Sequence, residues 1–560
     1  MPEAQLAAYL SDKRCLLILD NFEHLLDAAP GISDLLIAAP GVDVLVTSRE
    51  ALRLQEEWFH PIAGLSFPDR FREIEIAPEP ATYDAVHLFE MCSLRAQPTF
   101  SLSAHWQEVV HICQLVDGMP LGIELAATWL SVLSISAIAT EIERNLDILT
   151  ARHRNMPKRH SNMRAVLEQS WAMLAPREQE ILARLSLFRG SFDRRAAEVV
   201  AETSLLELTP LFEKALLRVT PSGRYLLHEL LRQFTLEKLA QNRDAVADTG
   251  RRHARYYLDF LHEREYTLYD KTQSAVLDEV KLELDNIRAA WSYALEVGDV
   301  DLLEKAATGL HRFFTLRSRF REGRELLTTG LLRLDSTPPS DHVRRLRAQL
   351  QLQCGSLLVI TDAIESGRQM VEQGLANATD TRWQAFGAYT LGWLAKAQGN
   401  RVAAIEQLQR SRQLSQSIDD LNGETEALIG LSDVISTFVD YEEGAQLGRQ
   451  ALALARRLGR PDLIARALDM LAWATNCMGN YDEAESYWQE SLEICRAIES
   501  LYGVAINLGF LGWTAYCNGG GHLPAGLQYY QEALTILRQI GDRNNLAMTL
   551  GDIALASVDA

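Results

Sequence analysis

The chain has 560 residues, of which 47% are hydrophobic and 23% charged, so it has the size and composition of a globular protein with several domains. Its formal net charge of -20 opposes binding to polyanions, and we therefore expect neither direct nucleic-acid binding nor contact with an acidic membrane face. The seven cysteines form no Cys-x-x-Cys pair, which argues against a zinc finger and indicates reduced thiols in a cytoplasmic protein.

The first elements that the sequence predicts are two short strands with a helix between them. Residues 15–20 (CLLILD) and 42–47 (VDVLVT) are apolar runs rich in branched side chains, and a leucine-containing stretch separates them. A strand, helix, strand unit of this kind predicts a parallel sheet. Residues 1–14 contain acidic side chains and no apolar run, so they do not resemble a signal peptide.

From about residue 81 the pattern is helical almost throughout, with turn signals such as the Gly-Met-Pro of residues 118–120. The longest uncharged stretch, residues 125–140, is short for a membrane span and contains several Ser and Thr. We therefore expect buried helix there and no membrane association. Residues 336–340 (STPPS) predict a linker.

After this linker the sequence repeats, because small residues recur at spacings of 37 to 40 residues in one column and two further columns follow in register. The first column is Gly355, Gly392, Ser432, Ala472, Gly512 and Gly551; the second is Gly367, Ala404, Gly444, Ala484 and Gly526; the third is Gly374, Ser411, Ala451, Ser491 and Ala533. Antiparallel helices approach closely only where side chains are small. The columns therefore predict stacked helical hairpins.

These units resemble tetratricopeptide repeats, and the resemblance covers residues 345–560. Such hairpins stack into a curved α-solenoid whose first helices line the inner, concave wall. Four aromatic residues beside the small column are candidates to bind a protein partner or peptide there: Tyr389, Trp393, Trp473 and Trp513. The alternative is that these rings fill spaces between hairpins. Self-association of the chain is a further possibility.

Residues 15–24 have the form of a Walker B strand, in which an apolar strand delivers an Asp, here Asp20, to its carboxyl end. A carboxylate at that position can orient Mg²⁺, usually through water. The alternative is an ordinary strand whose terminal Asp caps the next helix.

Further landmarks follow in an order that resembles the NB-ARC and STAND signalling ATPases over residues 15–330. They are the strand-end Thr47-Ser48-Arg49, the segment 118–125 (GMPLGIEL), residues 164–192 in the position of a winged helix, Leu227-His228-Glu229, and residues 283–290 at the junction to the repeats. The resemblance implies that Asp20 and Asn21 lie near Mg²⁺ and nucleotide, that Arg49 reaches the terminal phosphate, that Pro120 packs by the adenine and that His228 senses the diphosphate. Arg49 as a surface arginine, Pro120 as a helix-entry proline and His228 as a core histidine are the alternatives.

One departure from this family is decisive for the chemistry. The phosphate loop G-x-x-x-x-G-K-[ST] is absent, no Gly-Lys dipeptide occurs in the chain, and only fourteen residues precede Cys15. That loop supplies the backbone N–H groups and the Lys that hold the phosphates. We therefore expect no cofactor in this chain alone, with ATP or ADP and Mg²⁺ bound only if an upstream segment is supplied, and we favour a protein that is not a self-sufficient enzyme.

The predicted fold class is mostly α, with a truncated parallel α/β NTPase remnant, a helical and winged-helix segment, and an α-solenoid. The predicted domains are a partial P-loop NTPase core (residues 1–80), a helical domain (81–155), a winged-helix domain (156–245), a helical linker domain (246–335) and the repeats (340–560). The predicted function is a regulatory scaffold of the STAND class that binds a protein partner through its repeats.

Two alternatives stay open. In the first, the chain is the C-terminal part of a working ATP-hydrolysing transcriptional regulator. In the second, the winged helix binds DNA through five arginines: Arg177, Arg184, Arg189, Arg194 and Arg195. A solvated helix face is the simpler explanation of these arginines.

Overall fold

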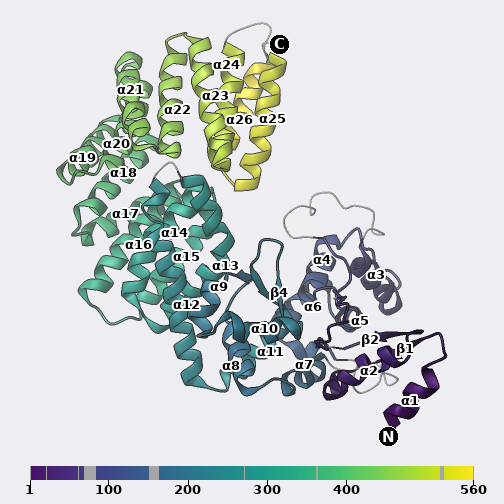
Figure 1. Ribbon diagram of the computed structural model, residues 1–560. Helices are drawn as coiled ribbons and strands as arrows, with labels where there is room; N and C mark the ends of the chain where they lie inside the picture. The colour runs from purple at the N-terminus through teal and green to yellow at the C-terminus, as the bar shows by residue number, and fades with distance from the viewer. Residues whose placement is uncertain are drawn as a thin grey trace. The chain divides into compact units, whose positions relative to one another are not determined.

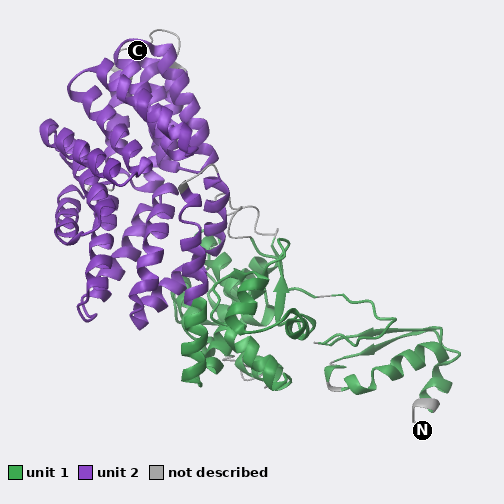
Figure 2. Cartoon of the chain, turned by 60° about the vertical axis from the view of Figure 1, so that its left-hand side comes forward, with its two compact units in different colours: residues 1–253 green, residues 254–560 purple. Residues whose placement is uncertain are grey.

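The computed structural model describes residues 2–20, 22–48, 50–60, 62–68, 83–150, 163–269, 272–360, 363–517 and 523–558 (Figure 1). The chain divides into two compact units, residues 1–253 and residues 254–560 (Figure 2). Helices numbered α1 to α26 dominate both units, and the described strands are few and short. The mostly α fold class is therefore confirmed.

The first unit begins with the predicted strand, helix, strand arrangement. After helix α1 (Pro2–Leu10), strand β1 (Cys15–Leu19) pairs in parallel with β2 (Val42–Val46), and α2 (Pro30–Ala38) connects them. One face of this pair packs on the two helices through a small cluster that includes Leu35 and Val42. On both strands the alternate side chains Leu16, Ile18 and Leu45 are more than half exposed, as the alternation of side chains along a strand requires when only one face is covered.

Helices follow in the next segment: α3 (Asp84–Ala96), α4 (Trp106–Leu115), α5 (Pro120–Ala127), α6 (Ile135–Arg144) and α7 (Met163–Ala172). Residues 125–140 do not form one buried helix as expected. They contain the end of α5, a 3₁₀ turn at Thr128–Ser131 and the start of α6, where Ser134 caps the helix by accepting a hydrogen bond from the Ala137 N–H at 3.3 Å. Within the described part of the chain, no helix is both long and apolar enough to cross a membrane.

Residues 176–240 alternate helices with short antiparallel strands. The order is α8 (Pro176–Leu185), β3 (Ser191–Phe192), α9 (Arg194–Ala201), α10 (Leu205–Glu213), β4 (Leu217–Val219), β5 (Tyr225–Leu227) and α11 (Glu229–Ala240). Strand β5 lies between β3 and β4. The next helix, α12 (Arg243–Glu263), is continuous through the predicted domain boundary after residue 245 and through the boundary between the two units.

The second unit is built from long helices in sequence. They are α13 (Gln273–Val297), α14 (Val300–Leu316), α15 (Phe320–Leu334), α16 (Asp341–Ile360), α17 (Ile364–Asn377), α18 (Thr381–Ala397), α19 (Arg401–Ser417), α20 (Leu421–Phe438), α21 (Tyr441–Leu458), α22 (Pro461–Cys477), α23 (Tyr481–Ala497), α24 (Leu501–Cys517), α25 (Leu523–Ile540) and α26 (Arg543–Val558). The predicted linker, residues 336–340, lies between α15 and α16.

The small-residue columns mark the places where two helices of a hairpin meet. A Cβ added to Gly355 would lie 2.5 Å from Val371 and 3.1 Å from the Gly367 carbonyl oxygen, so the first and second columns face each other. In another hairpin the Ser432 hydroxyl donates to the Gly444 carbonyl at 2.8 Å. Gly551 differs, because an added Cβ would meet no described atom within 4 Å.

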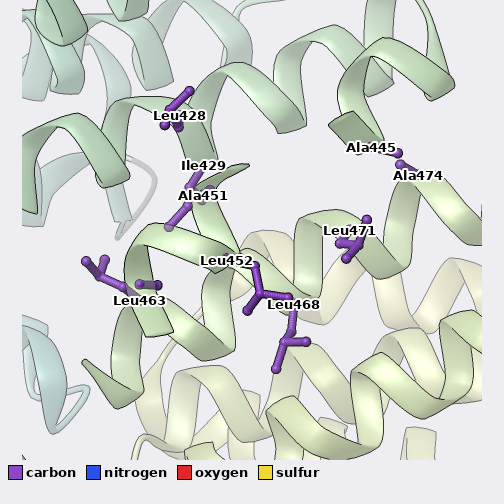
Figure 3. Packing of buried hydrophobic residues seen from close by; sticks show 11 residues of the cluster. Leu428, Ile429, Ala445, Ala451, Leu452, Leu463, Leu468, Leu471 and Ala474 are labelled. Atoms are coloured by element: carbon purple, nitrogen blue, oxygen red, sulfur yellow. The ribbon is translucent and has the colours of Figure 1, made fainter. Parts of the chain in front are cut away.

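Larger apolar side chains fill the space around these columns. One buried cluster joins α20, α21 and α22 (Figure 3) and includes Leu452, Leu468 and Leu471, all less than 10% exposed. Burying a leucine of this kind contributes roughly 1.5–3 kcal/mol, so clusters repeated from hairpin to hairpin hold the array together.

Helix α13 and the segment after α14 also form hydrogen bonds with helices much later in the chain. Gln273 at the start of α13 donates to the Asp462 carboxylate of α22 at 3.0 Å. Arg317, after α14, donates to the Ile498 carbonyl at 3.1 Å, and the Tyr502 N–H donates to the Ser318 hydroxyl at 2.9 Å. The second unit is therefore held by contacts far apart in the sequence as well as by contacts between neighbouring hairpins.

Candidate functional site

Of the residues predicted at the strand ends, Asp20 is the one that the structure describes. It follows β1, is exposed, and accepts a hydrogen bond from the Thr47 hydroxyl at the end of β2. The pairing of the two parallel strands brings these side chains to the same edge. Asn21 and Arg49 lie outside the described residues.

Pro120 occupies the first turn of α5, where its missing N–H costs nothing. The preceding turn is tight, since Asp117 and Gly118 both have positive φ angles, 50° and 62°. A Cβ on Gly118 would lie 2.1 Å from the Leu65 carbonyl oxygen, so glycine is required here. The Gly118 carbonyl in turn accepts a hydrogen bond from the Leu65 N–H at 2.8 Å.

His228 caps α11, where its Nδ1 accepts a hydrogen bond from the Leu230 N–H at 3.0 Å. Its Nε2 lies 3.9 Å from an Asp117 carboxylate oxygen. Burial lowers the pKa of His228, and the charge of Asp117 offsets part of this effect. The structure thus brings the Pro120 turn and His228 together through Asp117, which sequence reasoning did not single out.

The charged groups described around His228 include Asp117 and Arg218. A phosphate at His228 Nε2 would lie beside the Asp117 carboxylate, which repels it. Arg218 of β4 pairs with that same carboxylate. No Gly-Lys dipeptide is available elsewhere in the sequence to hold phosphates.

In the second unit, Trp473 of α22 and Trp513 of α24 line one cavity of about 210 Å³. Phe510 and Met548 line the same cavity, so its wall is mainly apolar. The Trp473 and Phe510 ring centroids are 5.7 Å apart. Trp473 and Trp513 are each partly exposed, whereas Trp488, on which Phe510 stacks, is fully buried.

Tyr389 of α18 lines a second cavity of about 350 Å³, whose wall combines apolar and aromatic side chains with charged and polar ones. We call it the polar cavity, for these charged and polar groups. The Tyr389 hydroxyl bonds with Arg466 of α22, and burial raises the pKa of this tyrosine, so it stays protonated. Trp393 lines neither of these two cavities. Its ring meets the Tyr389 ring edge-on, with the two ring centroids 6.2 Å apart, and the Lys396 ammonium lies over the Trp393 ring. Of the four predicted aromatic residues, Trp473 and Trp513 therefore line one cavity, Tyr389 lines the other, and Trp393 packs against Tyr389.

Several charged residues form the polar cavity, and sequence reasoning missed them. Arg312 and Arg460 both pair with Asp462 at the start of α22. Burial raises the pKa of Glu426, which lies 3.5 Å from Arg312. Burial and the neighbouring Arg312 lower the pKa of His311 to about 3, so this imidazole is neutral.

The remaining lining groups come from helices α16, α18, α19 and α20 and from the turn before α20. They include Gln353, Trp383, Phe386, Ser415, Asp420 and Asn422. Because the residues that line this cavity run from Tyr266 to Arg460, no local sequence motif identifies them. The one local signal is the pair Gln349 and Gln353 within a helix that is otherwise apolar on its buried face.

Comparison with known proteins supports the prediction of tetratricopeptide repeats. The family model "Tetratricopeptide repeat" matches residues 424–497. "Putative HTH-type transcriptional regulator Rv0890c" of Mycobacterium tuberculosis is 27% identical over 553 residues, which cover 96% of this chain and 52% of that protein. "Uncharacterized protein Rv0894" of the same organism is 32% identical over 259 residues, which cover 44% of this chain and 62% of that protein. The chain spans about half the length of the first of these relatives.

Two solved structures are also similar. One is described as a Signal Transduction ATPase with Numerous Domains (STAND) protein with a tetratricopeptide repeat sensor from Pyrococcus horikoshii; it is 14% identical, with a TM-score of 0.39, covering 99% of this chain and 82% of that chain. The other is a Rap protein complexed with Competence and Sporulation Factor, 12% identical with a TM-score of 0.40, covering 52% of this chain and 80% of that chain. The predicted resemblance is confirmed in its coarse form: the chain carries tetratricopeptide repeats and is similar along almost its whole length to proteins named as transcriptional regulators.

Proposed function

We propose that this chain is the regulatory and partner-binding part of a STAND-type transcriptional regulator. In this proposal the repeats bind a protein partner or peptide on their inner wall. The observation that carries it is the cavity between Trp473 and Trp513, two tryptophans that hold the same place in successive repeats. Partly exposed tryptophan in an apolar cavity is typical of an interface anchor, since a partner completes its burial.

The alternative, that these rings only fill space between hairpins, applies better to Trp488. That residue is fully buried and stacks on Phe510 with ring centroids 5.1 Å apart. Trp473 and Trp513, by contrast, border open cavity volume. The neighbouring Asn545 and Asp552 add polar groups at the edge of the same cavity, an arrangement common in binding pockets.

The test uses the full chain as bait for proteins of its native host lysate, with the Trp473→Ala and Trp513→Ala variants alongside. We expect each variant to melt close to the unmodified chain and to retain less partner. Trp58→Ala is the matched control, because Trp58 is 96% exposed and lies in the other unit. Trp488→Ala serves as the comparison for a packing tryptophan, and we expect it to lower the free energy of unfolding by roughly 3–5 kcal/mol.

If Trp473→Ala and Trp513→Ala retain the same partners as the unmodified chain, the inner wall is not the binding surface. If instead they lose as much stability as Trp488→Ala, these rings are packing residues. Either result contradicts the proposal.

For the nucleotide, we propose that binding is lost from this chain alone or depends on a phosphate loop supplied from outside it. The absent Gly-Lys dipeptide and the carboxylate of Asp117 beside His228 support this. We further propose that residues 176–227 form a winged helix. In this proposal the winged helix has a regulatory role and does not bind DNA. The element order and the β3-β5-β4 sheet support the fold, and the arginines there are engaged: Arg177, Arg184 and Arg194 each pair with a glutamate.

A further inference from the structure

Two buried polar side chains that line the polar cavity have no hydrogen-bond partner among the described residues. Gln353 of α16 is 1% exposed, and both its amide nitrogen Nε2 and its amide oxygen Oε1 lack a partner there. The Ser415 hydroxyl of α19 is 0% exposed and is in the same state within the described region. Since buried polar groups are normally satisfied, these two indicate that the cavity holds a molecule that forms hydrogen bonds.

The other two glutamines of α16 differ from Gln353, because each donates a hydrogen bond within the chain. Gln349 is 3% exposed and donates to the Thr308 hydroxyl at 3.2 Å. Gln351 donates to the Gln373 side-chain oxygen at 3.3 Å. Gln353 is the glutamine of the three that lines the polar cavity, so its amide is left to a ligand.

The arginines that line the cavity each have a carboxylate partner. Arg312 and Arg460 both bond with Asp462, and Arg382 lies 3.4 Å from Glu265. A charged ligand would compete with these pairs and leave a buried charge without its partner. The cavity therefore favours an uncharged ligand.

Aromatic side chains form another part of the wall. The Trp383 and Phe386 rings of α18 have their centroids 5.8 Å apart, and the neutral His311 ring lies 5.7 Å from Phe386. A flat ring in the cavity can pack against such side chains.

The amide of Gln353 specifies the polar group of the ligand. A glutamine amide carries a donor and an acceptor in one plane, so its complement is a group with an acceptor and a donor side by side. Glutamine forms a pair of this kind with the edge of adenine. Ring carboxamides and ring lactams are small uncharged molecules with such an edge.

We infer that the polar cavity binds a small uncharged molecule that carries an amide on, or within, a flat ring. Gln353 pairs with the N–H and C=O of this amide, and the ring packs against Trp383 and Phe386. At about 350 Å³ the cavity lies at the lower end of the volumes typical of small-molecule sites, which fits a ligand of this size. It shares no lining residue with the cavity between Trp473 and Trp513, so the inference is independent of the proposed partner binding.

The experiment titrates the full chain calorimetrically with nicotinamide, a ring carboxamide, and with uracil, a ring lactam. Methyl nicotinate and 1,3-dimethyluracil are the matched analogues, because they keep the ring and the carbonyl groups but have no N–H donor. We expect at least one of the two amides to bind, and its analogue to bind at least about tenfold more weakly.

Three variants locate the site. Gln353→Met keeps the length of the side chain but removes its amide, so we expect about tenfold weaker amide binding with an unchanged or higher melting temperature. Trp383→Ala, at a partly exposed position, should also weaken binding about tenfold, because it removes a ring contact. Gln351→Met is the control: it lies on the same helix, lines neither cavity, and should leave amide affinity within about twofold.

If neither amide binds, or each binds no better than its analogue, the cavity holds water only and the inference is wrong. It is also wrong if a folded Gln353→Met chain keeps the affinity of the unmodified chain. Should Gln353→Met not fold, Trp383→Ala decides, and unchanged affinity in that variant overturns the inference. None of these results affects the lysate experiment, which tests the proposed function separately.

Discussion

At the scale of single residues, burial of the acid Asp469 on α22 is expected to make the stability of the repeats depend on pH. Asp469 is 6% exposed and has one carboxylate oxygen without a hydrogen-bond partner in the described structure. Burial raises its pKa from 3.8 to about 7, although hydrogen bonds to Ser491 and Asn507 act in the opposite direction. The folded protein therefore keeps a proton that the unfolded chain releases.

We predict that Asp469→Asn stabilises the protein more at pH 8 than at pH 5. Because the folded pKa lies above the unfolded one, the cost of keeping aspartate is absent below pH 3.8, grows as the pH rises, and is complete above pH 7. At about 1.4 kcal/mol per pH unit, the gain from asparagine should be about 2–3 kcal/mol larger at pH 8. Denaturant unfolding at the two pH values measures it.

Asp433 provides the control for this prediction, because it is similarly buried at 5% but bonds with Lys396. Asp433→Asn should destabilise the protein at both pH values, since it leaves a lysine without its partner. An Asp469→Asn effect of equal size at pH 5 and pH 8 would show that the carboxyl group does not titrate in this range.

Pro120 and His228 were singled out from local sequence, and the structure joins their segments through Asp117. Their roles at a nucleotide stay predictions. Gln353 could not be found in this way, because local sequence does not show that its buried side chain has no hydrogen-bond partner among the described residues. The same holds for Arg460, whose role follows from contacts with residues of distant helices.

At the scale of elements, the two-stranded sheet contrasts with the hairpins. Strands β1 and β2 pair only with each other within the described residues, and Leu16, Ile18 and Leu45 stay exposed on their open face. Helices α22 and α23, by comparison, contact a further hairpin on each side. Local stability follows such differences in buried contacts.

We predict that amides of β1 and β2 exchange with deuterium well before those of α22 and α23. Hydrogen exchange followed by mass spectrometry gives the comparison within one sample, so each region serves as reference for the other. Equal protection of both regions would mean that the front sheet is covered in solution, contrary to this prediction.

Helices and strands could be predicted where the sequence pattern that specifies them lies within or next to the element itself. Alternation and apolar runs gave β1, β2 and their parallel pairing, and the small columns gave the hairpins. Residues 125–140 were misjudged because composition does not show where Ser134 ends one turn and caps the next helix. The close packing at most column positions did not extend to Gly551, since spacing in sequence does not guarantee a neighbour in space.

At the scale of the whole molecule, the given sequence contains no Gly-Lys dipeptide and therefore no phosphate loop of the form G-x-x-x-x-G-K-[ST]. We predict that the purified chain neither binds Mg-ATP tightly nor hydrolyses it above the uncatalysed rate. Isothermal titration and phosphate release measure the two quantities. Magnesium-dependent turnover that Asp20→Ala abolishes would refute the prediction.

The hydrogen bonds between the early helices of the second unit and its later helices determine the order in which this unit can fold during synthesis. Gln273 is made 189 residues before its partner Asp462, and Ser318 is made 184 residues before Tyr502. At 5–20 residues per second, α13 and α14 therefore leave the ribosome roughly 10–40 s before the helices that complete their hydrogen bonds. The hairpins between them can form pair by pair in that interval from contacts between neighbours. The polar cavity is completed only when Arg460 joins His311 and Gln353, so a nascent chain acquires this cavity only after the start of α22 has been made.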